Sequence, residues 1–475
     1  MSFATPLFLW YFLPTVLVAY WVLPTRFRNL TLATTSLVFY ALGGRAHVWL
    51  LIAMITANFL AGLAIGRTRR RGARVANLAL GAAVGANLAV LGLWKYAGFA
   101  SGQVDGIAQR FGWHVPGISL ALPLGISFFT FHCISYVVDI HRGTRPALSN
   151  PIDFTAYIAQ FPQLVAGPII RYHEIAEQLG ETGRDRLGDF AAGMPRFALG
   201  LSKKVLIADS VAPIADAAFG LPSPGLGWAA AWLGIVAYTV QIYFDFSGYS
   251  DMAIGLGRMF GFQFPENFNR PYSAESMTDF WRRWHLSLSS WFRDYLYIPL
   301  GGNRAGPMRT YRNLGVVFLL TGLWHGANWT FLIWGMYHGG LLILERRTGL
   351  AVVKHQRLVM VRRTMTMLIV MVGWVPFRSD DLNTAWHYIE VMFIPRVQAL
   401  GPELDAVLTH GHQFWLVIGS LSVLLPGTFN LGRLIEQGRG WGPLVIRFAL
   451  VAVIAPYAAA LVASGTFSPF LYFKF

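Results

Sequence analysis

Long apolar runs separated by short polar loops extend along most of this 475-residue chain. A run of about 18–20 apolar residues is long enough to cross the ~30 Å hydrocarbon core of a bilayer as a helix. The pattern therefore predicts an all-α polytopic membrane protein with about 11–12 transmembrane helices, together with re-entrant and interfacial helices. The principal apolar runs lie at 6–23, 30–42, 48–65, 75–93, 118–138, 228–262, 358–375, 414–425 and 444–464.

The run at 314–344 contains no acidic residue, lysine or arginine, yet it carries His325 near its centre. As one helix it would extend ~46 Å, longer than the hydrocarbon core, so we expect it to tilt, protrude or break. Gly322 and Gly326 flank the histidine and favour a break there. An imidazole at bilayer depth is a candidate functional group, because burying a polar side chain away from water costs free energy that a residue without a function would not need to spend. The alternative is that His325 only hydrogen-bonds a neighbouring helix.

Two apolar runs in the middle of the chain, 154–170 and 197–207, are short or interrupted. Pro162 and Gly167-Pro168 break the first, and the pair Lys203-Lys204 breaks the second. Such segments are typical of re-entrant or interfacial helices. Asp245 and Asp251 lie within the run 228–262, and carboxylates at that depth need hydrogen-bond donors or water. They either hold the fold together or line a polar path, and we favour the structural role.

The segment 266–312 is too polar to cross a membrane, and it predicts an amphipathic interfacial helix. Ser276 is a candidate N-cap for that helix. His285 lies within it, either as an ordinary interfacial histidine or, if the segment folds back into the membrane, close to His325. A second interfacial helix is expected at 380–392. The apolar positions that recur near helical spacing in the first are Phe280, Trp281, Trp284, Leu288 and Trp291.

Composition and charge support a membrane protein and exclude several other classes. Hydrophobic residues make up 55% of the chain and charged residues only 13%, unlike a soluble domain. The formal net charge of +15 does not indicate a nucleic-acid partner, because the basic residues lie in short loops between apolar runs. The chain has a single cysteine, Cys133, so it cannot form an intrachain disulfide. We interpret Cys133 as a packing residue. No metal site and no bound cofactor are predicted.

Arginine-rich loops also predict the topology. The basic cluster after the third run faces the cytoplasm by the positive-inside rule, which puts the N-terminus outside. The first run looks like a retained helix rather than a removed signal peptide. Arginines before the last run place its start in the cytoplasm and the C-terminus outside. The cluster consists of Arg67, Arg69, Arg70, Arg71 and Arg74.

Several long motifs resemble the membrane-bound O-acyltransferase family, in its bacterial polysaccharide branch. The similarity extends over nearly the whole chain, so it is more specific than a match to one short pattern. The motifs are PLGISFFTFHCISYVVDIHRG at 123–143, FPQLVAGPIIRY at 161–172, IYFDFSGYSDMAIGLGRMFGFQFPENFNRPY at 242–272, FWRRWHLSLSSWFRDYLYIPLGGN at 280–303, TGLWHGANWTFLIWGMYHG at 321–339 and SPFLYFKF at 468–475.

The resemblance implies one membrane domain over 1–475, with a core at 118–345 and a last helix and aromatic tail at 444–475. It implies a central tunnel with a donor site on the cytoplasmic side and an acceptor outside. The family's active-site histidine falls on His325 and its second characteristic histidine on His285. The implied activity is O-acetylation of an exported polysaccharide across a bacterial inner membrane, with both termini periplasmic. Alginate is the first choice of polymer, followed by cellulose or peptidoglycan.

The chemistry that this activity needs can be assigned to residues. His325 can take the proton from an attacking hydroxyl in a dry channel, with acetyl-CoA as the acetyl donor. Lys203 and Lys204 are candidates to attract the coenzyme A phosphates, or else anchor a helix at lipid headgroups. Tyr472 either belongs to an aromatic belt or carries the acetyl group covalently, as the resemblance to D-alanylation systems implies. Periplasmic acetyltransferase proteins are the expected partners that complete the transfer.

Two other classes of protein remain as alternatives. A polysaccharide transporter or flippase would also have intramembrane histidine and aspartate, although no matching halves are visible in this sequence. A scaffold for a secretion complex would not need the buried histidine. A D-alanyl-type acyl transfer protein is the alternative within the same family.

Overall fold

The computed structural model is built of helices, and it describes residues 2–69, 72–180, 186–222, 225–351, 358–395, 397–425, 431–465 and 469–471. Within these ranges there is no strand, so the predicted all-α fold is confirmed. Two compact units are formed, one by Met1–Met194 with Ala253–Pro265 and one by Pro195–Met252 with Glu266–Phe475. The single membrane domain predicted from the sequence stays a prediction.

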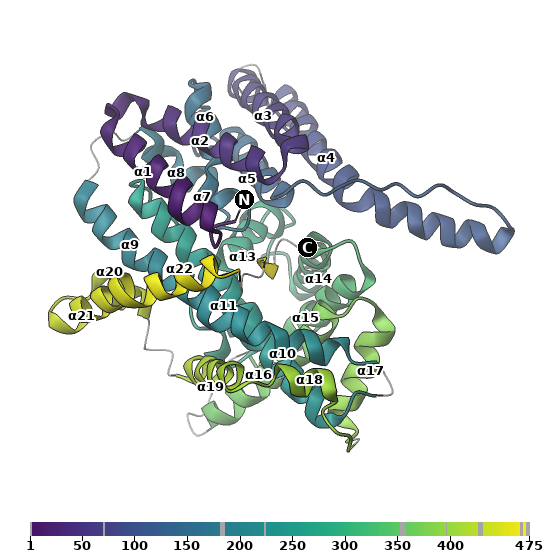
Figure 1. Ribbon diagram of the computed structural model, residues 1–475. Helices are drawn as coiled ribbons and strands as arrows, with labels where there is room; N and C mark the ends of the chain where they lie inside the picture. Colours follow the sequence, from purple (N-terminus) through teal and green to yellow (C-terminus); the bar gives the residue numbers. More distant parts are fainter. Residues whose placement is uncertain are drawn as a thin grey trace. The chain divides into compact units, whose positions relative to one another are not determined.

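The first unit contains the helices of the N-terminal part of the chain (Figure 1). A π-helical turn, Leu7–Phe12, leads directly into α1. The helices are α1 (Leu13–Val22), α2 (Arg28–Gly43), α3 (Val48–Thr68), α4 (Ala73–Ala108), α5 (Ile126–Arg142), α6 (Pro151–Ala159), α7 (Phe161–Leu164), α8 (Tyr172–Gly180) and the first half of α9 (Arg186–Ser202).

The second unit contains the remaining helices and all the candidate catalytic histidines. The long helix α11, Trp228–Met259, contributes most of its length to this unit and its last residues to the first. The other helices are α10 (Asp209–Gly220), α12 (Met277–Trp281), α13 (Leu286–Phe292), α14 (Pro307–His325), α15 (Trp329–Thr348), α16 (Val359–Arg378), α17 (Leu382–Phe393), α18 (Pro402–Val407), α19 (His410–Leu424), α20 (Leu431–Gln437), α21 (Trp441–Ala449) and α22 (Ala455–Ala463).

Five of the described helices are long and apolar enough to cross a membrane. They agree with runs predicted from the sequence, whereas the total of about 11–12 transmembrane helices stays a prediction. The five lie at Val48–Thr68, Ala73–Phe111, Trp228–Met259, Val359–Arg378 and Trp441–Ala463.

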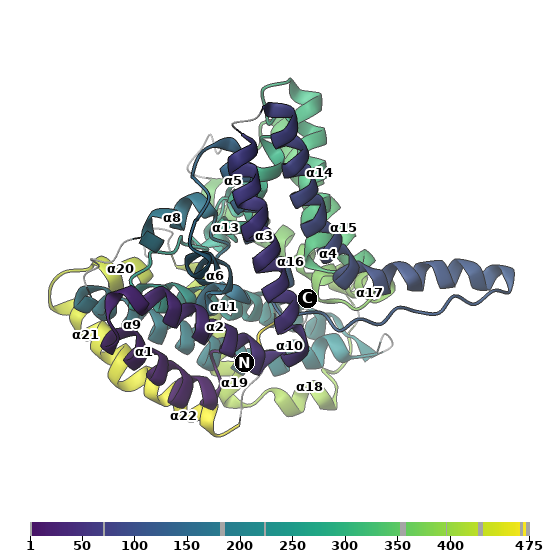
Figure 2. The same cartoon turned by 90° about the horizontal axis from the view of Figure 1, so that it is seen from above.

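The predicted apolar helix at 118–138 is wrong in its first half. α4 continues to Ala108, well past the expected end at 93, and residues 112–125 then return without helix before α5 begins at Ile126. In Figures 1 and 2, α4 and this returning segment project beyond the other helices of the first unit. Gly125 explains the late start, because its φ of 72° is left-handed and a Cβ there would clash with the Leu164 carbonyl oxygen.

The two interrupted runs in the middle of the chain compare differently with the expectation. The first is broken at two places: at Gln160, between α6 and α7, rather than at Pro162, and over residues 165–171, which contain the predicted break at Gly167-Pro168. The second is not broken at all, because α9, the π-helical turn Lys203–Ala208 and α10 follow one another without interruption. The two lysines stay in a buried helix because each forms an ion pair with a carboxylate.

The long apolar run at 314–344 folds as a helical hairpin, which confirms the predicted break beside His325. α14 ends at His325, Gly326 is extended, and the Asn328 side chain caps α15 by accepting from the Thr330 N–H at 3.2 Å. The two helices pack side by side (Figures 1 and 2). Gly322 and Gly335 bring their backbones together, since a Cβ on either would clash with a backbone carbonyl oxygen of the other helix.

The helix expected at 380–392 is also present, as α17. The Asp381 side chain caps it by accepting from the backbone N–H groups of Asn383 and Thr384 at 2.8 and 2.9 Å. The N–H of Thr384 is the main cause of a lowered Asp381 carboxyl pKa. Residues 379–381 separate α16 from α17.

Glycine packing in the hairpin gives a first prediction. Gly335→Ala places a methyl group against the Phe318 carbonyl oxygen and should lower the free energy of unfolding by about 1–3 kcal/mol. Thermal unfolding of the purified protein in detergent measures this loss. Gly340→Ala is the matched control on the same helix, because nothing lies within 4 Å of its added Cβ. Equal melting temperatures for the two variants would contradict the close packing.

Candidate active site

His285 lies at a sharp break between two short helices, not inside one amphipathic helix as the sequence predicted. Ser276 caps α12 as expected, accepting from the Asp279 N–H at 3.0 Å, but the helix ends at Trp281. His285 then takes a left-handed conformation, with φ 46° and ψ 55°, before α13 begins at Leu286. Such a backbone is uncommon for a residue with a Cβ and is found preferentially at functional sites.

A buried asparagine holds His285 in this conformation. The Asn267 Oδ1 accepts hydrogen bonds from the Ser287 N–H and Oγ at 3.3 and 2.9 Å, and the His285 Nδ1 lies 3.1 Å from it. The amide of Asn267 donates to the Ser250 Oγ at 3.1 Å, so its orientation is fixed with Oδ1 as the acceptor. His285 therefore carries its proton on Nδ1, which leaves Nε2 with the lone pair that a base uses.

His325 lies at the C-terminal end of α14 among aromatic rings, and only 4% of its surface is exposed. Its ring centroid is 5.0 Å from that of Trp334 on α15 and 5.0 Å from that of Phe377 on α16. Apolar walls of this kind exclude water from the imidazole. A neutral imidazole can accept a proton, which is what a general base must do.

Trp324 brings the two histidines together. Its ring centroid lies 4.9 Å from that of His325 and 6.0 Å from that of His285, and the His285 side chain is fully buried. Phe246 on α11 packs edge-on against the other side of His285, with centroids 4.6 Å apart. Both histidines therefore pack against one indole ring, and their catalytic roles stay predictions.

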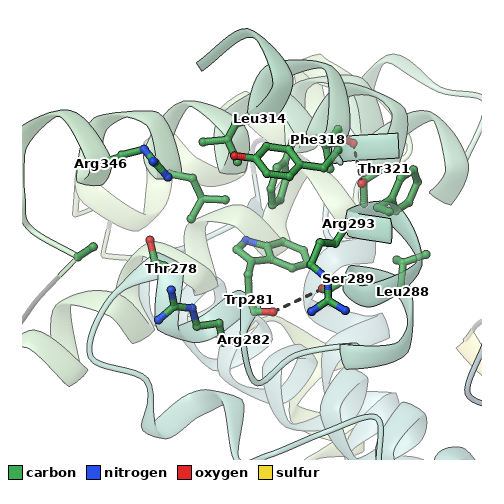
Figure 3. A pocket seen from close by; sticks show the side chains of 15 residues that line it. Thr278, Trp281, Arg282, Leu288, Ser289, Arg293, Leu314, Phe318, Thr321 and Arg346 are labelled. Carbon is green, nitrogen blue, oxygen red and sulfur yellow. Dashed lines mark hydrogen bonds between the residues drawn. The ribbon is translucent and has the colours of Figure 1, made fainter. Parts of the chain in front are cut away.

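A pocket of about 360 Å³ opens beside the same helices (Figure 3). Aromatic and aliphatic side chains line it, and three arginines border it. Figure 3 shows the Trp281 indole in its middle, with Arg282 and Arg346 towards one end and Arg293 towards the other. Its lining is Thr278, Trp281, Arg282, Leu288, Ser289, Phe292, Arg293, Tyr297, Leu314, Val317, Phe318, Thr321, Leu342, Arg346 and Ala351.

The charges around this pocket are positive. Arg282 and Arg346 are exposed and make no ion pair with any residue that the structure describes. Arg293 is paired with its neighbour Asp294 at 2.7 Å. The pocket therefore combines a basic rim with an apolar interior, which suits a ligand with an anionic head and an uncharged arm.

Lys203 and Lys204 lie elsewhere, in a buried network of ion pairs. The Lys204 Nζ is 2.7 Å from Asp245 and 2.6 Å from Asp209, and the Lys203 Nζ is 2.6 Å from Asp251. Arg196 also binds Asp251 at 2.6 Å. The expected donors for Asp245 and Asp251 are thus present, consistent with the structural role favoured for them. Binding of coenzyme A phosphates by these lysines stays a prediction, and their contacts with carboxylates do not support it.

The C-terminal tail enters the same network. Leu471 donates its backbone N–H to Asp245 at 3.0 Å, and both Phe470 and Leu471 are buried. The Phe470 ring lies under the Lys204 ammonium at 4.7 Å and edge-on to Tyr249 at 4.8 Å. Tyr472, the predicted acyl carrier, lies outside the described residues. Cys133 is buried and free, as expected.

Sequence reasoning did not single out the pocket arginines or His338. Arg282 and Arg293 lie in the segment predicted as an amphipathic interfacial helix, where basic residues are common, so they gave no separate signal. His338 lies thirteen residues after His325 in the run 314–344, and an uncharged residue among aromatics gives no periodic signal. Among the described residues, no group of three histidine, cysteine or acidic side chains is arranged to hold a metal ion.

Comparison with known proteins adds to this geometry. The sequence profile of MBOAT, the membrane-bound O-acyltransferase family, matches residues 121–377. A probable alginate O-acetylase of Azotobacter vinelandii is 49% identical over 83% of this chain and 78% of its own length. One from Pseudomonas putida is 43% identical over the full length of both chains. A peptidoglycan O-acetyltransferase of Helicobacter pylori is 37% identical over 82% of this chain and 80% of its own.

The support of His285 gives a second prediction. Asn267→Ala removes the acceptor shared by His285 and Ser287, and it should lower the free energy of unfolding by about 1–3 kcal/mol. Thermal unfolding in detergent measures the change, with the exposed Asn303→Ala as control. A loss no greater than that of the control would mean that Asn267 does not hold this turn.

Proposed function

The chain belongs to the membrane-bound O-acyltransferase family and is an integral membrane acyltransferase, and we propose that it moves acetyl groups from cytoplasmic acetyl-CoA to an exported polysaccharide. The observation that carries this proposal is the pair of buried histidines on the Trp324 ring. Alginate is the acceptor best supported, because the relatives from Azotobacter and Pseudomonas are named as alginate O-acetylases. Cellulose and peptidoglycan follow, the latter supported by the Helicobacter relative.

His325 is the proposed general base. It takes the proton of an attacking hydroxyl while the new acetyl–oxygen bond forms and the acetyl–sulfur bond breaks. The proton then passes from the imidazole to the departing thiolate, so the products are an acetyl ester and free coenzyme A. Base assistance of this kind supplies about 10²–10⁴-fold in rate. His285 shares Trp324 with His325, and we assign it as a site-associated group beside the proposed base.

The basic pocket is the proposed entrance for the donor. Coenzyme A carries phosphates at one end and an uncharged thioester arm at the other, which corresponds to the basic rim and apolar interior. Arg282 and Arg346 are more suitable phosphate ligands than Lys203 and Lys204. Phosphate would have to compete with the carboxylates that already hold those two ammonium groups.

The tail is the proposed route of the acetyl group on the exterior side. Burial of Phe470 and Leu471 supports a tail that reaches into the second unit, so that Tyr472 can receive the acetyl group as a phenyl ester. Periplasmic acetyltransferase proteins would complete the transfer to the polymer. The location that fits this role is a bacterial inner membrane, with both termini in the periplasm.

The alternatives have less support. A transporter or flippase would not need the acyltransferase motifs around His325, and a scaffold would not need a buried imidazole. A D-alanyl-type acyl transfer shares the fold and the family. It is less favoured because the relatives that cover most of this chain are named as O-acetylating proteins.

Loss of the base tests the proposed function. His325→Ala should lower the O-acetyl content of the secreted polymer by about 10²-fold or more, because it removes the group proposed to take the proton from the attacking hydroxyl. The assay complements a strain that lacks the gene and measures O-acetyl groups and total polymer separately.

His410→Ala, an exposed histidine at the start of α19, is the matched control and should leave acetylation unchanged. Polymer secretion should continue in both variants. If His325→Ala instead stops polymer export while the polymer that escapes stays acetylated, the chain is a transporter or scaffold.

A conservative change at the tail tests the acyl carrier. Tyr472→Phe removes only the phenolic oxygen and should abolish O-acetylation, while protein level and membrane insertion stay normal. This variant tests the phenolic oxygen more specifically than deletion of the tail does. Deletion would also remove Phe470 and Leu471, which pack in the core, and would unfold part of the second unit. Phe473→Tyr is the control for a changed aromatic ring nearby. Wild-type acetylation by Tyr472→Phe would rule out the acyl-tyrosine step.

A further inference from the structure

His338 is a fully buried histidine on α15 that the mechanism above does not use. Neither of its ring nitrogens has a hydrogen-bond partner among the residues that the structure describes. Each buried polar group left without a partner costs about 1–3 kcal/mol. A histidine with two such atoms therefore destabilises the fold if it serves only in packing. This indicates that a ligand binds to it.

The neighbours of His338 also have hydrogen atoms to donate. Its ring centroid lies 5.2 Å from that of Trp281 and 4.9 Å from that of Trp334. The indole Nε1 of each of these tryptophans is buried and likewise has no partner within the described part of the chain. Indole nitrogens only donate, so these three touching rings contain at least three N–H groups, none of which donates to an acceptor that the structure describes.

This cluster, defined as Trp281, Trp334 and His338, connects the basic pocket to the proposed base. Trp281 lines the pocket, and its indole stands in the middle of it (Figure 3). Trp334 contacts His325 on its other side, with ring centroids 5.0 Å apart. Since the Trp281 and Trp334 ring centroids are 5.7 Å apart, the cluster forms a continuous chain of ring contacts from the pocket to His325.

The backbone of α16 closes the cluster from a third side. A Cβ on Gly373 would come within 2.8 Å of the His338 Nε2, so only glycine leaves room for the imidazole there. Trp374 and Tyr337 complete the surroundings, with centroids 6.5 and 5.2 Å from His338. No carboxylate is among these contacts, and a carbonyl oxygen would find N–H donors here.

We propose that the cluster is a subsite for the thioester carbonyl of the acyl donor, with His338 as the donor of its principal hydrogen bond. The inference rests on the proposed function, because acetyl-CoA is the donor assumed. As the acceptor oxygen attacks, negative charge develops on the carbonyl oxygen and the hydrogen bond from His338 strengthens. When the carbon–sulfur bond breaks, the negative charge leaves the carbonyl oxygen and the C=O double bond forms again. The sulfur departs as the thiolate and takes the proton from His325.

His338→Phe separates this role from a structural one. Phenylalanine fits an aromatic cage and removes two unsatisfied polar atoms, so its melting temperature should equal or exceed that of the wild type. If His338 binds the carbonyl, kcat should fall by about 10²-fold, the usual cost of one lost donor in an oxyanion site, with KM for acetyl-CoA nearly unchanged. His338→Gln, which restores an N–H donor, should recover part of kcat.

The assay uses membrane vesicles from the complemented strain, with labelled acetyl-CoA as donor and the secreted polymer as acceptor. Arg346→Gln is the comparison variant on the same helix: loss of a phosphate ligand should raise KM and leave kcat unchanged, the opposite signature. Wild-type kcat in a stable His338→Phe would overturn the inference.

Failure of this inference is distinguishable from failure of the proposed function. If His325→Ala is inactive and His338→Phe is fully active, the assignment of His325 as the general base is supported and His338 is only a packing residue. If both variants acetylate the polymer normally, the proposed function fails together with the inference. An unstable His338→Phe would contradict the premise that the cage has room for a ring without polar atoms.

Discussion

Close contact between two helix backbones is the interaction on which the rest of this structure depends. α14 and α15 approach at Gly322 and Gly335 so tightly that neither position has room for a methyl group. This contact converts one apolar run, too long to cross a bilayer directly, into a hairpin whose bend lies beside His325. The imidazole is thereby carried on a rigid helix end and walled by aromatic rings, where water does not compete for its lone pair.

Much of this could be predicted from the sequence, because the signals were local or compositional. The break beside His325, the cap at Ser276 and the need of Asp251 for hydrogen-bond donors each follow from short-range chemistry, and each is present. What failed was decided by tertiary contacts. Aromatics at helical spacing around His285 predicted one helix, but Asn267, eighteen residues earlier, holds His285 in a left-handed turn. No periodicity within the segment could reveal that partner.

The second unit contains two contrasting sets of buried polar groups. Around Lys204 each charge finds a partner, Asp209 or Asp245, and even the backbone N–H of Leu471 is used, so that network holds the fold. Around His338 the donors have no such partner among the described residues. Natural proteins rarely leave several buried donors unused in one place, and when they do a ligand or water is usually implicated. The contrast distinguishes a structural polar network from a candidate binding subsite within one unit.

The central claim is that acetyl groups pass through this protein from a donor on one side of the membrane to an acceptor on the other, with His325 as the base. The most direct measurement uses sealed inside-out vesicles with labelled acetyl-CoA supplied only outside and unlabelled polymer trapped within. The account predicts labelled polymer in the lumen for the wild type and none above background for His325→Ala. Labelling that requires acetyl-CoA inside the vesicle, or that continues in His325→Ala, would contradict it.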